Sequence, residues 1–392
     1  MQWNNQQAAA MEQVRRWLAS DPTEPFKLWG FAGTGKTTCA RTFAEGVEGK
    51  VLFAAFTGKA AHVMRQAGCP DATTLHSLIY VPCERSRVKL TQLLRELEQS
   101  NDAEESQRLQ GEIDKEKKHL KSPMFVPRED SPLETASLLI IDECSMVGED
   151  MAKDLMSFGV PILVLGDPAQ LPPVRGTGYF TSGKPDVMLT EIHRQAKDNP
   201  IIELATRARE GQSLALGTYG DSRVVTKDDF DPDAVRDRQQ VLVGKNVTRK
   251  RANARIRTNR GFTCEVEPGD RLVCLRNDHD LGLLNGATFT VLAVHDWDED
   301  IVGCTVVSEL DGEGHYVEMH GEILRGGEVD GWLRREAQEF AHGYALTVHK
   351  AQGSQWRDVV LVDESRCFGN DRHKWLYTGL TRASETITVV KT

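Results

Sequence analysis

The sequence predicts an α/β protein of two parallel-sheet domains, with a helical insertion in the first domain and a small β-barrel inserted in the second. Three observations indicate this fold. Residues 1–80 alternate short apolar segments with helix-like segments, which is the βαβ rhythm of a parallel sheet covered by helices. The segments 138–143 and 161–167 are near-continuous apolar runs, as strands buried on both faces require. Residues 265–335 instead contain short strand-like runs separated by turn signals.

The composition is that of an ordinary globular chain. Its 392 residues are enough for roughly two to four domains, and 40% of them are hydrophobic. No apolar run approaches the ~18 residues that a membrane helix needs, and no secretion signal is evident, so we expect a cytoplasmic protein without membrane contact. The eight cysteines form no Cys-x-x-Cys pair, which argues against a zinc site or a disulfide framework.

The net charge of −10 bears on nucleic-acid binding. This acidic balance argues against a nonspecific basic coat for nucleic acid. A localised basic channel remains compatible with it, because only the lining of such a channel has to be positive.

Residues 30–38 read Gly-Phe-Ala-Gly-Thr-Gly-Lys-Thr-Thr and fit the phosphate-loop pattern Gly-x4-Gly-Lys-Thr. The segment 26–29 before them suits a buried strand, and 38–45 suits a helix. In that setting backbone N–H groups surround phosphate oxygens, Lys36 reaches the β- and γ-phosphates, and Thr37 holds Mg²⁺. This context disfavours a chance glycine turn. The predicted ATP-binding residues are Gly30, Gly33, Thr34, Gly35, Lys36, Thr37 and Thr38.

Asp142 and Glu143 end the apolar run at 138–143 and are the expected partners of this loop. The Asp142 carboxylate would orient Mg²⁺, and Glu143 would polarise the attacking water. Two surface acids are the alternative. In the segment 166–173, Gln170 could sense the γ-phosphate, although the segment also fits a proline-stiffened turn.

Two arginines are candidate fingers for the transition state of phosphoryl transfer. Arg194 lies in the segment 189–195 and Arg382 in 379–383. A planar cation on the γ-phosphoryl group contributes roughly 10³–10⁵ in rate. We therefore assign both to the catalytic set with Lys36.

Residues 84–121 predict a charged antiparallel helical hairpin. One apolar stripe follows i, i+3, i+4, i+7 spacing and a sparser one follows a turn at 99–102. A solvated spacer and an arm that guides DNA or binds replication or recombination proteins are equally good interpretations. Prolines in 123–135 suit an irregular loop or a small hairpin. The stripe residues are Leu90, Leu93, Leu94 and Leu97, then Leu109, Ile113 and Leu120.

The second half begins with a more polar region, 190–262, whose pattern is weak. Strand-like runs follow at 271–275, 288–292 and 304–307, with Asn-Gly and Asp-Gly turn signals between them. We interpret them as the inserted barrel. The second α/β domain resumes near Ala341 and ends with a strand at 386–390.

With these motifs in place, the chain resembles superfamily 1 DNA helicases of the 5′-to-3′ branch (superfamily 1B), the family of RecD and phage Dda. The matching motifs run from residue 3 to residue 390. The resemblance implies two RecA-like motor domains facing each other across an ATP cleft, and an SH3-like barrel that starts near 277–286. It also implies Mg-ATP hydrolysis that drives 5′-to-3′ translocation on single-stranded DNA and unwinding of duplex.

The resemblance also implies roles for single residues. Gln7, in the segment 3–7, matches an adenine-reading glutamine, although Gln6 is the alternative register. Gln352 and Gly353 would lie near the nucleotide. Phe125 matches the position of a strand-separating pin, and an equally good interpretation is a core or loop-anchoring Phe. The implied DNA contacts are Thr57, Lys59, Thr74, His76, Phe125, Thr347, His349 and Lys350.

These interpretations give a domain plan and a set of partners. We expect a monomer that uses ATP and Mg²⁺ and binds single-stranded DNA and duplex junctions. The expected first motor domain comprises 1–80 and 136–185 with the insertion 81–135, and the second comprises 186–264 and 336–392 with the barrel 265–335.

Three other functions stay open from the sequence. The chain could be a DNA-stimulated ATPase that translocates without unwinding. It could be a nucleotide-regulated DNA-binding subunit of a recombination or repair complex. It could also be an unrelated phosphate-loop NTPase that acts on protein partners, which the two arginines and the DNA-type segments disfavour.

Overall fold

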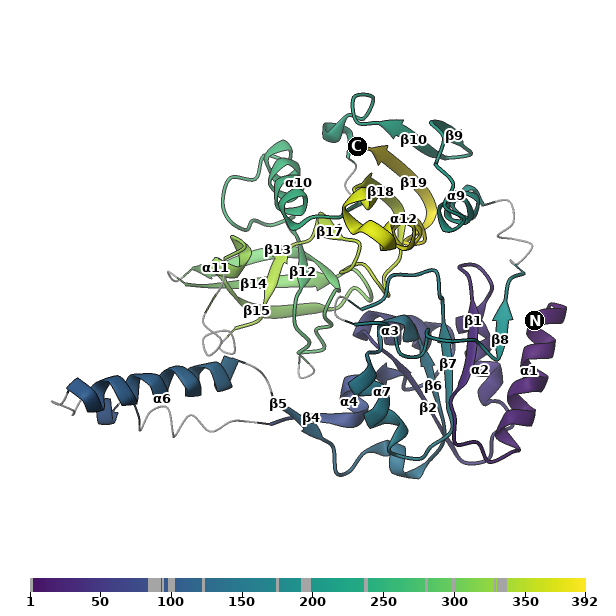
Figure 1. Cartoon of the computed structure of the whole chain (residues 1–392). Helices are drawn as coiled ribbons and strands as arrows, with labels where there is room; N and C mark the ends of the chain where they lie inside the picture. The colour runs from purple at the N-terminus through teal and green to yellow at the C-terminus, as the bar shows by residue number, and fades with distance from the viewer. Residues whose placement is uncertain are drawn as a thin grey trace.

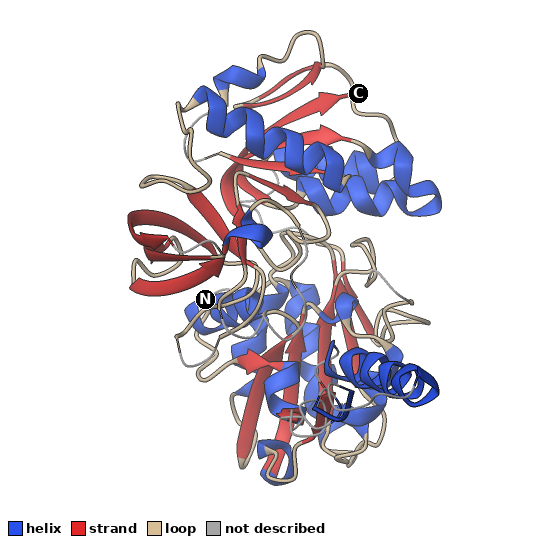
Figure 2. Cartoon of the chain, turned by 90° about the vertical axis from the view of Figure 1, so that its left-hand side faces the viewer, coloured by secondary structure: helices blue, strands red, loops and turns tan. Residues whose placement is uncertain are grey.

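A computed structural model of the chain shows two helix-covered sheets, a third sheet beside the second, and a helix that projects from the first (Figures 1 and 2). The structure describes residues 3–83, 93, 95–97, 103–121, 124–173, 176–191, 199–235, 239–278, 281–297, 300–327, 329 and 337–392. Arg194 and most of the first arm of the predicted helical hairpin lie outside these residues.

The first sheet is entirely parallel, as the βαβ rhythm predicts. Within the described ranges its strand order is β3 (Thr73–Thr74), β2 (Lys50–Ala55), β6 (Ala136–Asp142), β7 (Ile162–Gly166), β1 (Phe26–Gly30) and β8 (Val187–Leu189). Every residue of β7 and the last five of β6 are buried, because helices cover both faces.

Short local signals set the helices of this domain. Asn4 begins α1 (Asn5–Leu18) with a capping box that it forms with Gln7, and Thr57 caps α3 (Gly58–Gln66). Together with α2 (Lys36–Ala44), these helices pack on one face of the sheet. The other face is covered by α4 (Leu75–Ile79) and α7 (Glu149–Met156).

The first insertion differs in part from its prediction. Its base is a two-stranded antiparallel ribbon of β4 (Tyr80–Cys83) and β5 (Met124–Pro127), so of the two structures predicted for 123–135 the local hairpin does not form. The reason is that β5 pairs with a strand on the far side of the insertion. The helix α6 (Ala103–Lys121) is the second predicted arm, and it projects away from the sheet (Figure 1). Its Leu109 and Ile113 pack with Leu93 of the first arm, as the stripes indicate.

The second sheet is also mainly parallel. Its order among the described strands is β17 (Ala345–Thr347), β11 (Gln240–Val243), β18 (Trp356–Asp363), β19 (Ala383–Lys391), β10 (Ser222–Thr226) and β9 (Gly217–Tyr219), of which β9 alone is antiparallel to its neighbour. The helices α9 (Pro200–Arg209) and α12 (Arg372–Leu380) pack on one face, and α10 (Asn246–Asn259) packs on the other.

The inserted sheet is antiparallel and carries its own core. Its described strands run in the order β15 (Gly314–His320), β14 (Ile301–Ser308), β13 (Thr288–Trp297), β12 (Arg271–Cys274) and β16 (Phe340–His342), with α11 (Gly321–Leu324) after β15. A bridge between Met319 and Gln338 joins the two edges, so the sheet closes toward a small barrel. In the described ranges the structure also has short 3₁₀ helices: η1 (Pro132–Thr135), η2 (Cys144–Met146), η3 (Pro232–Ala234) and η5 (Ser365–Asp371).

Two predicted domain limits shift. β8 pairs with β1, so the first sheet extends past residue 185. β16 pairs with β12, so the inserted sheet extends past residue 335 and the second domain resumes at β17. Both strands have three residues, too few to show a period in sequence.

A buried ion pair fixes the inserted sheet to the second domain. Arg257 of α10 donates to both carboxylate oxygens of Asp270 at 2.9 and 2.8 Å, and the Tyr344 hydroxyl donates to the same carboxylate at 2.9 Å. Asp270 is fully buried. Removing one partner from such a pair leaves an uncompensated charge in the interior.

We predict that Asp270→Ala lowers the free energy of unfolding by about 3–5 kcal/mol, because the Arg257 charge stays buried without its partner. Urea denaturation measures this. Asp233→Ala is the matched control, since Asp233 pairs with Arg255 of the same helix at 2.9 Å on the exposed surface. Asp233→Ala should lower the free energy of unfolding by much less than Asp270→Ala does. Equal losses in the two variants would contradict a structural role for the buried pair.

Candidate active site

Three neighbouring strands of the first sheet lead to the predicted catalytic groups at one edge. Asp142 ends β6, the segment with Gln170 follows β7, and the glycine loop follows β1 (Figure 1). Because the strands are parallel and adjacent, their carboxyl ends meet at the same edge, where open α/β sheets bind ligands. The sheet order therefore brings together Lys36, Thr37, Asp142 and Glu143.

The loop has the backbone conformation that its glycines predict. Gly33 and Gly35 have φ of 78° and 77°, in the left-handed region that glycine adopts without strain. Gly35 then caps α2, so the helix starts at Lys36 and directs its first N–H groups toward the loop. The Lys36 ammonium donates to the carbonyls of Gly30 at 2.8 Å and Phe31 at 3.1 Å.

Thr37 and Asp142 lie side by side. The Thr37 hydroxyl donates to Oδ2 of Asp142 at 2.5 Å, and the Glu143 N–H donates to its Oδ1 at 2.8 Å. Burial raises the pKa of Asp142, and the charge of Glu143 adds to this, while Thr37 and Lys36 oppose it. A hydroxyl and a carboxylate oxygen are the hard donors that Mg²⁺ prefers, so this pair fits the predicted metal ligands.

Glu143 has a strained backbone. Its φ of 53° and ψ of 42° place a non-glycine residue in the left-handed region, at the turn from β6 into η2. Such conformations cost about 1 kcal/mol or more and cluster at functional sites. The turn sets Glu143 directly after the predicted metal ligand.

A tyrosine of the second domain reaches the same edge. The Tyr377 hydroxyl of α12 accepts from the N–H of Ala32 at 2.8 Å and donates to Oδ2 of Asp167 at 2.6 Å. Asp167 also accepts from the N–H of Ala169 at 2.9 Å. Burial raises the pKa of Asp167, and Lys36 and Tyr377 counteract this rise. One hydroxyl therefore joins the glycine loop and the end of β7 to the second domain.

Further contacts join the domains around this tyrosine. The Leu171 N–H donates to the Thr378 hydroxyl at 2.9 Å, and the Gln352 side-chain amide donates to the Leu171 carbonyl at 2.8 Å. The Arg209 guanidinium lies 3.6 Å from the centroid of the Phe31 ring. The predicted nucleotide residue Gln352 thus contacts the segment that contains Gln170.

Gln170 of this segment and Arg382, which follows α12, are both predicted catalytic residues, and their hydrogen-bond partners differ. Gln170 is buried, and its Oε1 has no hydrogen-bond partner among the described residues, which is uncommon for a buried polar atom. Arg382 is also buried. Its guanidinium donates to the carbonyls of Thr378 at 3.1 Å and Ser354 at 3.2 Å, within the second domain. Its role as a finger stays a prediction, and Arg194 lies outside the described residues.

Both N-terminal glutamines make contacts that position neighbouring segments. The Gln7 side chain donates to the Thr34 carbonyl at 3.0 Å and accepts from the Asn4 N–H at 3.1 Å. Gln6 accepts from the N–H groups of Thr190 and Glu191, both at 2.9 Å. In this arrangement Gln7 supports the glycine loop, and its reading of adenine stays a prediction.

Most of the residues predicted to contact DNA have local partners. Thr57, Thr74 and Thr347 each accept a backbone N–H at the start of a helix or turn. Half-buried rings flank the two histidines: Phe56 lies 5.6 Å from His76, and Phe368 lies 5.4 Å from His349, between ring centroids. Burial lowers the pKa of both histidines. Of Phe125 the structure describes only the backbone, in β5.

The first-domain DNA segment meets the second domain closely. A Cβ on Gly353, whose φ is 72°, would lie 2.6 Å from the Thr57 hydroxyl. Lys59 is 5% exposed, and its ammonium lies 4.3 Å from the centroid of a Trp356 ring. Burial lowers the pKa of Lys59 to about 7, and Arg271 adds to this effect. A DNA contact by Lys59 therefore needs the two domains to move apart.

Two family models match the sequence of this chain. Residues 2–229 match the model described as AAA domain, and residues 342–390 match the UvrD-like helicase C-terminal domain. The first match covers more than half of the chain. The chain belongs to the AAA domain family.

Two relatives share sequence with this AAA-domain chain. The ATP-dependent RecD2 DNA helicase of Deinococcus radiodurans is 28% identical over 392 residues, which cover 91% of this chain and 46% of that protein. The probable conjugal transfer protein TraA of Sinorhizobium fredii is 23% identical over 292 residues, which cover 66% of this chain and 24% of that protein. The chain thus spans about half the length of the first relative and a quarter of the second.

Solved Pif1 helicases share the fold. Pif1 from a study of DNA unwinding at forked duplex DNA has a TM-score of 0.57 at 20% identity, over 99% of this chain and 92% of the other. Pif1 from Candida albicans has a TM-score of 0.54 at 19% identity, over 100% and 94%. These likenesses confirm the predicted fold class of two RecA-like sheets. The SH3-like character of the inserted sheet stays a prediction.

Sequence reasoning missed Tyr377, Asp167 and Arg209 as residues of this site. One signal for Tyr377 was present. It lies in α12, whose residues 375–380 are all buried. A tyrosine in a fully buried helical turn needs a partner for its hydroxyl, and the partner had to come from a facing element.

We predict that Tyr377→Phe lowers the free energy of unfolding by about 1–3 kcal/mol, because the buried Asp167 carboxylate loses a hydrogen bond. It should also reduce ATP turnover, since the loop loses its link to the second domain. Denaturant unfolding and a steady-state ATPase assay measure these effects. The control is Tyr179→Phe, a hydroxyl without a hydrogen bond to other described residues. A wild-type turnover in Tyr377→Phe would contradict the coupling role.

We predict that stability rises with pH between about 7 and 10.5 through Lys59. In this range the folded state holds Lys59 neutral, while the unfolded chain keeps the proton up to its ordinary pKa of 10.5. The unfolded state therefore binds more protons, so raising the pH favours the folded state, by at most about 1.4 kcal/mol per pH unit.

Lys59→Met should remove this contribution, so the variant's stability advantage over wild type shrinks as the pH rises from 7.5 to 9.5. Denaturant unfolding at each pH measures the difference. The exposed Lys50→Met serves as control. A constant difference between wild type and Lys59→Met across this range would show that Lys59 keeps its proton in the folded state.

Proposed function

We propose that this chain is an ATP-dependent DNA helicase that translocates 5′-to-3′ on single-stranded DNA. The observation that carries the proposal is the meeting of two domains at one nucleotide loop. The loop and its acids belong to the first sheet, and Tyr377 and Gln352 of the second domain contact the segments beside them. The RecD2 and Pif1 relatives, which are named helicases, support the same proposal.

The residues of the first sheet supply the groups that ATP hydrolysis needs. Thr37 and Asp142 would hold Mg²⁺, which neutralises charge on the β- and γ-phosphates when bound. Lys36 would move from the loop carbonyls to the phosphates. Glu143, fixed by its turn after Asp142, would orient and deprotonate the attacking water. Arg382 would complete the site from the second domain.

Hydrolysis becomes movement if the two domains grip the strand differently when the cleft is closed and when it is open. The contact of Gly353 with Thr57 lies between the predicted DNA segments of the two domains. Opening the cleft would separate these segments and expose Lys59. Each cycle would then shift one domain along the strand relative to the other.

We predict that Lys36→Ala and Glu143→Gln each lower ATP turnover by at least about a hundredfold, since the first loses phosphate binding and the second loses the general base. Glu143→Gln should still bind ATP, because Lys36, Thr37 and Asp142 remain. A steady-state ATPase assay and fluorescent-nucleotide binding measure these effects. Loss of nucleotide binding in Glu143→Gln would contradict its role as the base.

The direction of movement has its own test. Wild-type protein with Mg-ATP should displace a strand from a duplex with a 5′ single-stranded tail and fail on a 3′-tailed duplex. Glu143→Gln is the control, because it should bind both substrates and displace neither. Displacement from the 3′ tail alone would refute the direction. DNA-stimulated hydrolysis without displacement on either substrate would favour a translocase or a regulated DNA-binding subunit.

A further inference from the structure

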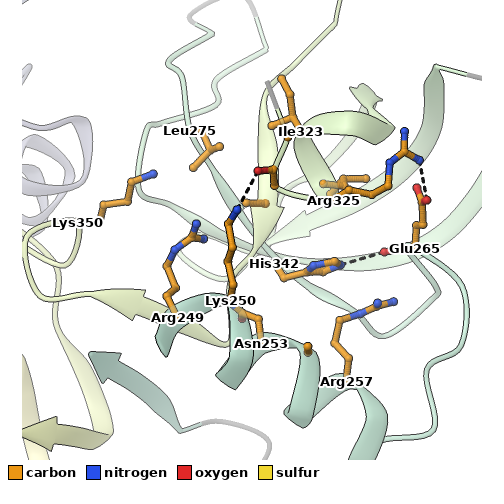
Figure 3. A pocket seen from close by; sticks show the side chains of 15 residues that line it. Arg249, Lys250, Asn253, Arg257, Glu265, Leu275, Ile323, Arg325, His342 and Lys350 are labelled. Carbon is orange, nitrogen blue, oxygen red and sulfur yellow. Dashed lines mark hydrogen bonds and ion pairs between the residues drawn. The ribbon is translucent and has the colours of Figure 1, made fainter. Parts of the chain in front are cut away.

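A basic cavity lies between α10 of the second domain and the inserted sheet. Its volume is about 460 Å³, within the range of ligand sites in proteins, roughly 300–1,000 Å³. Its walls come from α10, from the segment around α11, from the end of β16, and from Lys350 after β17. Figure 3 shows cationic side chains on both sides of it.

The cations on one side of the cavity are neutralised. Arg325 donates to the Glu265 carboxylate at 2.6 Å, and Arg257 pairs with Asp270. His342 is hydrogen-bonded to the carbonyl of Glu265 at 2.9 Å. The cations on this side therefore have partners, while Oε2 of Glu265 is buried without a hydrogen-bond partner among the described residues.

The other side holds three cations without a carboxylate partner in the described part of the chain: Arg249, Lys250 and Lys350. Lys250 donates to a backbone carbonyl, that of Gly326, at 3.0 Å, and Arg249 donates to the amide oxygen of Asn246 at 3.3 Å. Neither contact neutralises a charge. Figure 3 shows the ends of these three side chains on the same side of the cavity.

The positive charges in this group repel one another. Burial and the charge of Arg249 lower the pKa of Lys350, against a partial offset from Glu339, which pairs with Arg276 at 3.4 Å. Burial also lowers the pKa of Arg249. Unpaired cations at a concave site lower their free energy by binding an anion, and charge-assisted hydrogen bonds to phosphate are among the strongest available.

We propose that this cavity binds phosphate groups of a single-stranded DNA, through Arg249, Lys250 and Lys350. The inference deepens the proposed function and rests on it for the identity of the ligand. Lys350 connects the cavity to Thr347 and His349, the predicted DNA segment of the second domain. A strand that passes this segment reaches the cavity, whereas the glycine loop already provides a separate site for a free nucleotide.

The charge distribution of the chain supports a local site of this kind. The 14-residue helix α10 contains five Lys or Arg residues and no Asp or Glu, in a chain whose net charge is −10. Arg255 and Arg257 of this helix are paired with aspartates. Arg249 and Lys250 at its other end remain for the cavity, so the positive potential is concentrated where the predicted strand passes.

The test is the salt dependence of DNA binding without nucleotide. Anisotropy of a labelled oligo(dT) gives Kd at several salt concentrations. Each lost phosphate contact should reduce the slope of log K against log salt by about 0.7. We expect this reduction, with a Kd raised by about tenfold at low salt, in Arg249→Gln and in Lys250→Gln. Arg249→Lys should keep most of the slope, because it keeps the charge.

Arg251→Gln is the matched control, since Arg251 lies on the same helix, is exposed and does not line the cavity. Its slope should equal that of wild type. If all three Gln variants keep the wild-type slope, or all lose it equally, the cavity proposal is refuted. Thermal unfolding checks that the variants fold. If Arg249→Gln does not fold, Lys250→Gln still tests the cavity, because the Lys250 side chain is exposed.

Calorimetric titration with pyrophosphate separates a strand from a free polyphosphate. If Arg249→Gln loses pyrophosphate binding but keeps the wild-type slope on oligo(dT), the cavity binds free polyphosphate and our assignment is wrong. The wild-type protein could also fail to hydrolyse ATP while Arg249→Gln still reduces the salt slope on oligo(dT). That result would refute the proposed helicase function and leave the cavity assignment standing.

Discussion

Asp142 and Asp167 end neighbouring strands of the first sheet, and both are almost fully buried. A buried carboxylate is stable only when hydrogen bonds or opposite charges replace the water it has lost. The partners are Thr37 for Asp142 and Tyr377 for Asp167, with the Lys36 charge near both. Since these partners come from the glycine loop and from the second domain, satisfying two carboxylates fixes both parts of the molecule at one edge of the sheet.

The sequence was sufficient for the first sheet and its local motif. Continuous apolar runs predicted β6 and β7 within two residues. The glycine loop was predictable because its conformation follows from residue types that are adjacent in the chain. The pairing of Thr37 with Asp142 was also within reach, since each lies at the end of a predicted parallel strand or the start of the helix after one.

The remaining features depend on contacts between segments that are distant in the sequence. The local hydrophobic periodicity does not predict such contacts. Tyr377 lies 345 residues from Ala32, and the burial of Lys59 depends on three domains meeting. The pairing of β4 with β5 crosses the whole helical insertion. The basic cavity was hidden in the same way: α10 falls in a segment without clear apolar periodicity, and an overall charge of −10 conceals the five cations of one helix.

The inserted sheet enters and leaves its host at one point. Leu272, early in β12, pairs with His342 at the end of β16, and the chain then crosses at Gly343, where a Cβ would lie 2.8 Å from the backbone of Leu272. About seventy residues are therefore inserted into the second domain between two adjacent, paired strands, β12 and β16. Because of this connection, the inserted sheet can gain residues, lose residues or be replaced during evolution. The strand pairing of the second sheet would not change.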